Sequence, residues 1–230
     1  MKYALALILL SFSIGSFSQN YRYPPRNEAG KDSSLKVFVD TLKAVVGRKD
    51  APALLKMLSP NIQIYFEEKG NNIKGFTDEY KPADTSSQVW GFMSRIIAMG
   101  GVFEKDYKTG KTEKDFFILP YVAEMNIKHE YCDGCNTCLA VVAPDVNVRK
   151  NTDRLSASVG RLNYDVVKVI EDPVSKQMGG NSRNWTYIQT FDKKITGWVR
   201  HDLLYSTCDY RMYLQKAKGK WLITTFVAGD

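Results

Sequence analysis

The spacing of hydrophobic residues changes near Cys138, and this change limits the possible folds more than any other feature of the chain. Before it, apolar residues recur at the three- and four-residue intervals of amphipathic helices. After it, short apolar and β-branched runs alternate with closely spaced turn residues, which is typical of strands. The chain is therefore expected to form an α+β unit, then an all-β unit, and to end in a β-hairpin.

Residues 32–125 are predicted to form the α+β unit. Asp32 can cap a first helix, and Gly47 is expected to end it. Asp50 can start a shorter helix that Pro60 stops. Helices are predicted over residues 33–47, 50–59 and 86–99, and strands over 62–66 and 116–119.

Residues 139–205 carry turn signals at short intervals, with apolar runs between them. Strands are predicted at 139–142, 146–149, 166–170, 185–189 and 197–199, and this density favours a small barrel. Residues 206–230 predict a hairpin with strands at 210–215 and 221–226. Its turn, Lys218-Gly219, contains a glycine, the residue that most readily adopts the positive φ of such a turn. A lone hairpin is marginally stable, so it should pack on residues 32–125.

Residues 1–18 have the features of a secretory signal peptide. Lys2 is followed by an apolar run to Gly15, and small residues precede a cleavage expected before Gln19. The run is shorter than the roughly 20 residues of a membrane helix, so no stable membrane span is expected. Residues 19–31 contain two prolines and predict a leader that is either loose or ordered by contact with the rest of the protein. We expect an exported protein that is periplasmic or secreted after cleavage.

The net charge of +7 comes from 32 basic and 25 acidic residues spread along the chain. Such a diffuse positive field would favour anionic envelope polymers without specificity. No nucleic-acid recognition motif is present, and an exported chain rarely meets nucleic acid. Nucleic acid is therefore not expected as a partner.

Five segments between residues 140 and 205 resemble, in order and spacing, the SH3-type domain of exported bacterial proteins. They are VNVR at 146–149, SVGRL at 158–162, VVKV at 166–169, WTYI at 185–188 and TGWV at 196–199. The resemblance implies a small five-stranded SH3-like barrel at 139–205. Such a barrel is typically a non-catalytic module that holds a peptide, a cell-wall fragment or an envelope protein. One departure is the stretch 171–184, which is longer than the family's usual turn and enlarges one loop.

The flanking segments are also similar to exported bacterial proteins that carry an SH3-type segment. The similar residues are 100–103, 116–122 and the ending at 226–230. This similarity implies that the barrel is inserted into the α+β unit, whose chain would resume with the hairpin.

The resemblance also implies where a ligand would bind, because flat rings line SH3-type grooves and hold extended ligands. Rings of this kind and polar residues of the loop after the first barrel strand are both present. The candidate ligand-binding residues are Tyr164, Trp185, Tyr187, Trp198, Arg149, Asn151 and Asp153. The two tryptophans are equally suited to packing inside a small barrel. Tyr164, at a turn, is the better candidate for the groove.

Four cysteines are present, three of them in a C-x2-C-x2-C run. An even number of cysteines in an exported chain usually means disulfides, and three connectivities are possible. The two ends of an SH3-type barrel lie close together, so the resemblance favours a bridge from Cys138 to Cys208. Cys132 would then pair with Cys135.

The same cysteines allow a second class of function. Thiolates at this spacing can share a zinc ion, and a C-x-x-C pair can be redox-active. Cell-wall cysteine peptidases often carry SH3-type modules, and His201 could activate a thiolate. The alternative is therefore an envelope enzyme or thiol/metal protein built on Cys132, Cys135, Cys138 and His201.

We nevertheless expect a non-catalytic binding or scaffold protein of the cell envelope. The cysteines precede the predicted barrel in a glycine-bearing loop, rather than starting a helix in a catalytic core. The spacing also lacks the histidine of a covalent haem motif and the fourth nearby cysteine of an iron–sulfur cluster. No catalytic residue, metal or cofactor is therefore expected. A third possibility is that the barrel only braces the α+β unit, whose own cleft holds the ligand.

Overall fold

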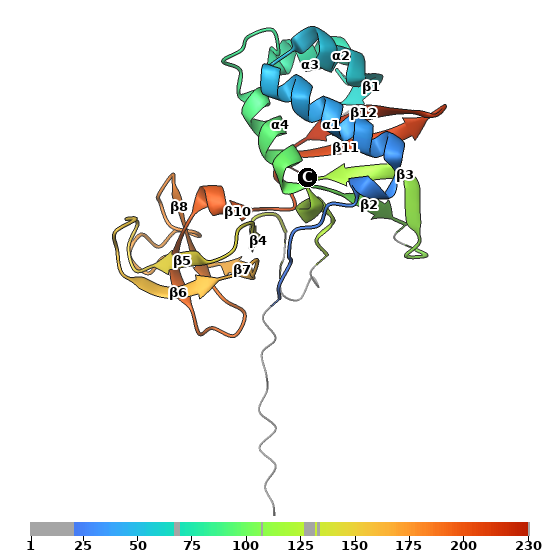
Figure 1. Cartoon of the computed structure of the whole chain (residues 1–230). Helices are drawn as coiled ribbons and strands as arrows, with labels where there is room; N and C mark the ends of the chain where they lie inside the picture. The colour runs from blue at the N-terminus through green and yellow to red at the C-terminus, as the bar shows by residue number, and fades with distance from the viewer. Residues whose placement is uncertain (1–20, 67–69, 107, 127–131, 133, 230) are drawn as a thin grey trace, which may run out of the picture.

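The computed structural model describes residues 21–66, 70–106, 108–126, 132 and 134–229. The predicted signal peptide, residues 1–18, lies outside them. Within these residues the chain is a mixed α+β protein with four α-helices and two β-sheets (Figure 1). We call the helices with the five-stranded sheet the helical unit, and strands β4–β10 the β unit.

The helical unit gathers its helices over one face of a five-stranded sheet (Figure 1). The helices are α1 (Ser33–Arg48), α2 (Ala51–Met57), α3 (Ile73–Tyr80) and α4 (Gln88–Met99), preceded by the 3-10 turn η1 (Ala29–Lys31). The strands are β1 (Leu58–Gln63), β2 (Val102–Lys105), β3 (Thr112–Leu119), β11 (Arg211–Ala217) and β12 (Lys220–Val227). Their order is β1-β12-β11-β3-β2, and only the β1–β12 pair is parallel.

The predicted helix starts at Asp32 and Asp50 are confirmed, whereas α4 begins at Gln88, two residues later than predicted. Asp32 caps α1 by accepting a hydrogen bond of 2.9 Å from the backbone N–H of Leu35. Helix α1 passes Gly47 and ends at Lys49, whose φ of 55° is left-handed. Pro60 lies in β1, which is an edge strand where a missing N–H is tolerated. Helix α3 was not predicted, because only Phe76 of its eight residues is buried.

The β unit is a seven-stranded antiparallel sheet in the order β10-β4-β7-β8-β9-β5-β6. Its strands are β4 (Cys138–Val141), β5 (Val146–Arg149), β6 (Ser158–Leu162), β7 (Val166–Val169), β8 (Trp185–Gln189), β9 (Thr196–Arg200) and β10 (Leu204–Tyr205). The predicted strands are therefore present. Within the described residues, however, β10 and β6 end the sheet without pairing, so no closed barrel is found.

Strands β11 and β12 lie between β1 and β3, although they come last in the chain. The chain thus leaves the helical unit after β3 and the short turn η2 (Tyr121–Glu124), builds the β unit, and returns. The hairpin turn has two central residues of positive φ, Lys218 at 51° and Gly219 at 77°. Such a turn matches the twist of the two strands that it joins.

From Tyr21 onward the leader contacts both units, which agrees with the alternative of a leader ordered by contact. Tyr21 accepts a hydrogen bond of 2.7 Å from the Val166 N–H, and Tyr23 donates one of 2.7 Å to the Tyr164 carbonyl. The Tyr23 ring stacks on Tyr121 at 5.4 Å. Burial raises the pKa of Tyr121 to about 12, so its phenol stays protonated and donates to the Tyr23 carbonyl. The two rings thus anchor the leader between the units.

The two units share a buried apolar cluster, so they form one packed body. Its members are Val102, Tyr121, Val122, Met125, Cys138, Ala140, Val166 and Tyr205. Helix α4 adds a polar contact, since Arg95 donates hydrogen bonds to the carbonyl oxygens of Asp202 and Leu204. None of the helices in the described residues is both long and apolar enough to cross a bilayer.

The four cysteines form two disulfides, as predicted, but with a different connectivity. Cys132 pairs with Cys138, and Cys135 pairs with Cys208. The register of the antiparallel β10–β4 pair does not by itself select the partner of Cys208, because Tyr205 lies opposite Ala140 and the continued register sets Cys208 opposite Thr137, between Cys135 and Cys138. Cys138 is bonded to Cys132, which leaves Cys135 for Cys208. Strand β10 was not among the predicted strands, so the sequence did not reveal this register.

Candidate binding groove

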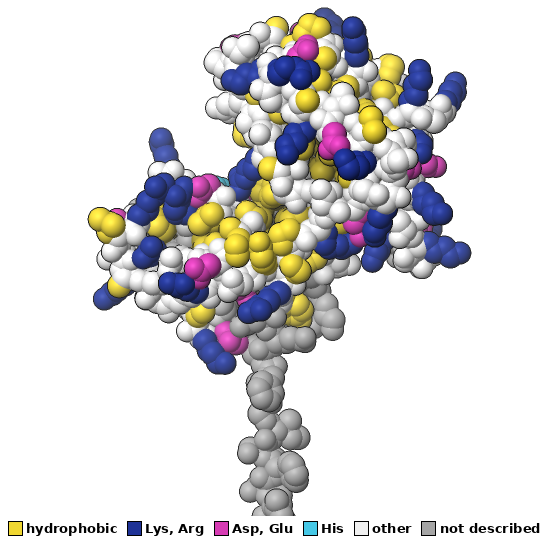
Figure 2. Space-filling model, in the orientation of Figure 1, with side chains coloured by type: hydrophobic (Ala, Val, Ile, Leu, Met, Phe, Trp, Pro, Cys, Tyr) yellow, Lys and Arg dark blue, Asp and Glu magenta, His cyan; other side chains and the backbone are white. Residues whose placement is uncertain are grey.

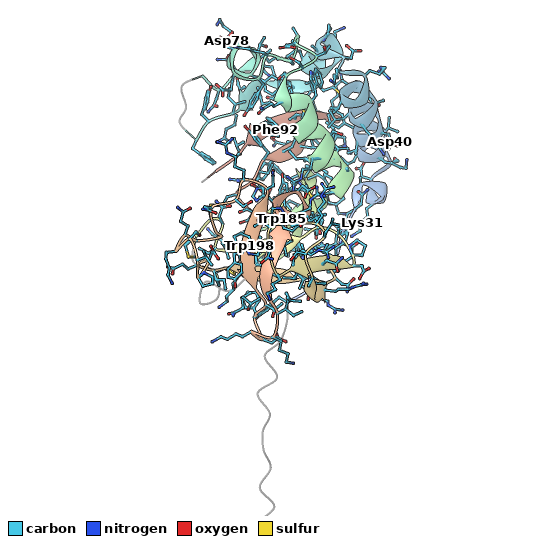
Figure 3. The ribbon with its side chains drawn as sticks, turned by 90° about the vertical axis from the view of Figure 1, so that its left-hand side faces the viewer. Lys31, Asp40, Asp78, Phe92, Trp185 and Trp198 are labelled. Carbon is cyan, nitrogen blue, oxygen red and sulfur yellow. A yellow bond between two sulfur atoms is a disulfide. The ribbon has the colours of Figure 1, made fainter. Side chains whose placement is uncertain are left out.

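A groove runs along the edge of the β unit that faces helix α4. It consists of two pockets of about 510 and 630 Å³. Arg183, Trp185 and His201 line both pockets, so the two lie side by side. In Figure 3, Trp185 lies closer to α4 than Trp198 does.

The first pocket has mainly apolar walls. Leu139, Val169, Met178 and Leu204 supply the hydrocarbon surface. Met178 is 63% exposed, so its side chain is accessible from solvent. Polar groups stand at its rim, where the Thr186 hydroxyl and Nδ1 of His201 are 3.2 Å apart. Pockets of this kind hold an apolar body and orient it with a few polar groups.

The second pocket is basic. Arg95, Arg154, Arg183 and Arg200 line it, together with Asp153 and Asp202. Figure 2 shows Lys and Arg side chains gathered at the upper edge of the β unit, where histidine is also visible. Because Arg95 belongs to α4, both units contribute to this pocket.

The side chain of Arg95 packs on the ring of the buried Tyr205. Its guanidinium lies 4.8 Å from the centre of the Tyr205 ring. Burial raises the pKa of Tyr205, so its hydroxyl stays protonated and donates a hydrogen bond of 2.5 Å to the Tyr210 carbonyl. These contacts hold the Arg95 side chain of α4 against the edge of the β unit.

Strands β8 and β9 present aromatic and basic side chains on one face. Trp185 lies opposite Arg200, and Tyr187 lies opposite Trp198. Since side chains alternate along a strand, these four share a face. Arg149 of β5 extends the row, because it pairs with Trp198 on the other side of β9. The opposite face carries the buried core of the β unit.

The long loop 171–184 covers part of this face. Gly180 has a φ of 83°, and a Cβ built there would lie 2.1 Å from a carbon of the Trp198 ring. Trp198 is accordingly 8% exposed, with the Tyr187 ring 5.1 Å away on its other side. The loop therefore buries Trp198 and leaves the half-buried Trp185 as the accessible ring of the groove.

The structure brings some of the candidate residues together and separates others. Trp185 and Asp153 line the groove. Arg149 and Asn151 shape the loop beside it, because their N–H groups donate to the carbonyl and the hydroxyl of Ser156.

Tyr164 lies elsewhere, at the junction of the two units. Its carbonyl accepts the hydrogen bond from the leader residue Tyr23, and it lines neither pocket of the groove. Its φ of 57° confirms that it occupies a turn. The position of Tyr164 in a turn was therefore not enough to bring its ring beside the other aromatic residues.

Sequence reasoning missed several residues that line the groove, namely Arg95, Arg154, Met178 and Arg183. Two of them belong to the stretch 171–184, whose unusual length was the available signal. Arg154 lies one residue beyond the candidate Asp153. Arg95 gave no signal, because it lies on a helix more than a hundred residues from the loop it contacts.

The cysteines and His201 do not form a reactive set in this structure. Cys135 lines the same pocket as His201, but its sulfur is bonded to Cys208. All four cysteines are paired, and none is a free thiol. In the described part of the chain, no group of His, Cys, Asp and Glu could hold a metal ion. His129, which precedes the cysteine run, lies outside that part.

The helical unit has a polar pocket of its own, of about 830 Å³, beside β2 and β3. Glu104, Glu113 and Glu124 line it. Burial raises the pKa of Glu104, and the neighbouring Glu113 charge adds to the effect. Burial and the Glu104 charge likewise raise the pKa of Glu124. Glu104 and Glu124 therefore bind protons more readily than free carboxylates do.

Comparison with known proteins provides no relative from which a function could be assigned to the groove. No protein family, no curated protein and no solved structure matches this chain. What the groove can hold is therefore inferred from its own residues.

Proposed function

We propose that the chain is a non-catalytic, exported binding or scaffold protein of the cell envelope. Its groove would hold an extended segment of a cell-wall fragment, a peptide or a partner protein beside Trp185. The adjacency of the apolar and basic pockets, which share Trp185 and His201, carries this proposal. An elongated, chemically mixed groove suits an extended ligand better than a compact one.

We further propose that the β unit is a variant of the SH3-type barrel. The five segments of the resemblance coincide with β5, β6, β7, β8 and β9, in that order. The loop 171–184 then accounts for the main departure, since it lies on Trp198 and displaces the groove toward α4.

Export is supported by the two disulfides, which persist in oxidising compartments. The predicted signal peptide at 1–18 agrees with them. The enzyme or thiol/metal alternative would require reduction of the Cys135–Cys208 bridge, because that sulfur is otherwise unavailable beside His201.

Co-sedimentation with purified cell-wall sacculi across a salt series tests the proposal. We expect retention that survives high salt and falls at least about tenfold in Trp185→Ala, because the half-buried but accessible ring supplies apolar contact that salt does not screen. Phe66→Ala is the matched control, since Phe66 is 51% exposed on the helical unit and lines neither groove pocket.

Equal retention of both variants, lost at modest salt, would mean that diffuse charge alone binds the wall and would contradict a groove ligand. No retention of the wild-type protein would exclude the cell wall as the ligand.

A further inference from the structure

The basic pocket of the groove has more arginines than acidic residues to pair with them. Of its two acidic residues, Asp202 already pairs with Arg200. Asp153 accepts a hydrogen bond of 2.9 Å from the Leu155 N–H within its own loop. Both carboxylates are thus engaged by neighbours in the sequence, while two further arginines face the same pocket.

Those two arginines are Arg154 and Arg183. Both are exposed, and across the described residues neither forms an ion pair. They come from different loops, the one after β5 and the one before β8, and yet line one pocket. A guanidinium presents parallel N–H donors that match the two oxygens of a carboxylate. The pocket therefore offers an anionic group two guanidinium groups that form no ion pair within the described residues.

An apolar site adjoins this basic one. Trp185 and Arg183 line both pockets, and they are two residues apart in the chain. The exposed Met178 lies on the Trp185 side, in the first pocket. An apolar group and an acidic group one or two residues apart in a peptide would reach both sites together.

From this arrangement, and resting on the proposed function, we propose that the groove recognises short acidic peptides. An apolar side chain would lie against Trp185 and Met178, and a free carboxylate would pair with Arg154 and Arg183. Such carboxylates occur both in the stem peptides of the cell wall and at the ends or acidic side chains of proteins. The shared chemistry is a carboxylate beside an apolar residue.

Calorimetric titration of the full mature chain tests this inference with two synthetic probes. One is an acetylated and amidated Ala-Leu-Glu-Glu peptide, and the other replaces both glutamates with glutamine. We expect binding of the first, and weakening on the order of tenfold for the glutamine peptide. Arg154→Gln and Arg183→Gln should each weaken the acidic peptide by a similar factor.

Arg161→Gln is the matched control. It removes the same charge from the β unit, but Arg161 is exposed, pairs with Asp145, and lines neither pocket. An equal loss in Arg161→Gln would show that net charge acts at a distance, and would overturn the inference. Equal binding of the two peptides would overturn it as well.

The failure of this inference is distinguishable from failure of the proposed function. If neither peptide binds but sacculi are still retained through Trp185, the groove function stands and the acidic-peptide inference falls. If the acidic peptide binds as expected, muropeptides released from sacculi can be compared with a peptide that has a free C-terminus. Tighter binding of one assigns the source of the carboxylate.

Discussion

Gly180 shows how a single residue determines which ring the groove exposes. Its positive φ allows the loop 171–184 to turn above Trp198, and its lack of a side chain lets the backbone contact the ring. The sequence marked this loop as long but did not indicate that it folds onto the sheet. Trp198 is consequently buried, whereas Trp185 borders both pockets.

Gly180→Ala should therefore destabilise the protein by roughly 2–4 kcal/mol, because overpacking adds to the cost of a left-handed backbone. Chemical denaturation measures the loss. Gly219→Ala is the control, since Gly219 also has positive φ but has open space around it; it should cost about 1–2 kcal/mol. If the two variants lost equal stability, the contact with Trp198 would be refuted.

At the scale of elements, a polar network joins the start of α1 to the terminal hairpin. The Ser34 hydroxyl donates to Asp32 at 2.6 Å and accepts from Nε1 of Trp221 at 3.0 Å. Lys216 reaches the same Asp32 carboxylate at 3.0 Å. These contacts connect residues more than 180 positions apart and hold the hairpin against the helix layer.

Asp32→Ala should cost about 1–2 kcal/mol, the usual value of a helix cap. Hydrogen bonds from Ser34, the Leu35 N–H and Lys216 lower the pKa of Asp32 in the fold. The stabilisation is therefore complete above the ordinary carboxyl value of 3.8 and is lost progressively as the pH falls below it. Denaturation of wild type and variant at several pH values should show the difference between them shrinking in acid.

Asp40→Ala is the control for this pH dependence. Asp40 lies on the same helix but is exposed and forms only an i,i+4 pair with Lys36, so its loss should cost less than about 0.5 kcal/mol. A difference for Asp32→Ala that stayed constant in acid would contradict the role of the carboxylate charge.

The elements that the sequence predicted are those whose signals are local. The Asp32 cap, the alternation in β5 and β8 and the Lys218-Gly219 turn each depend on a few neighbouring residues. What it did not predict depends on distant partners. Arg95 joins the groove only because the two units pack together, and the short β10 is held by pairing with β4. No local pattern encodes either contact.

At the scale of the whole molecule, the Cys135–Cys208 bridge closes the chain around the β unit. It spans 73 residues, whereas Cys132–Cys138 spans 6. The bridge thus joins the segment before β4 to the segment between β10 and β11, beside the groove that Cys135 lines. The bridge therefore constrains the relative position of the two units.

In the chain-entropy account, the longer bridge stabilises by about 4 kcal/mol and the shorter by about 2. Replacing Cys135 and Cys208 with serine should therefore lower the free energy of unfolding more than replacing Cys132 and Cys138. Non-reducing denaturation of the two double variants measures the difference. A larger loss for the shorter bridge would contradict this connectivity or the entropic account.

The central position of β11 and β12 also bears on the order in which the chain can fold during synthesis and export. Every residue of the β unit leaves the ribosome or the translocation channel before these two strands do. Until Val227 has emerged, β1 lacks its partner β12 and β3 lacks its partner β11, and these open edges can pair with other chains. The sheet of the helical unit, which the chain begins first, is therefore completed only after all the strands of the β unit have been made.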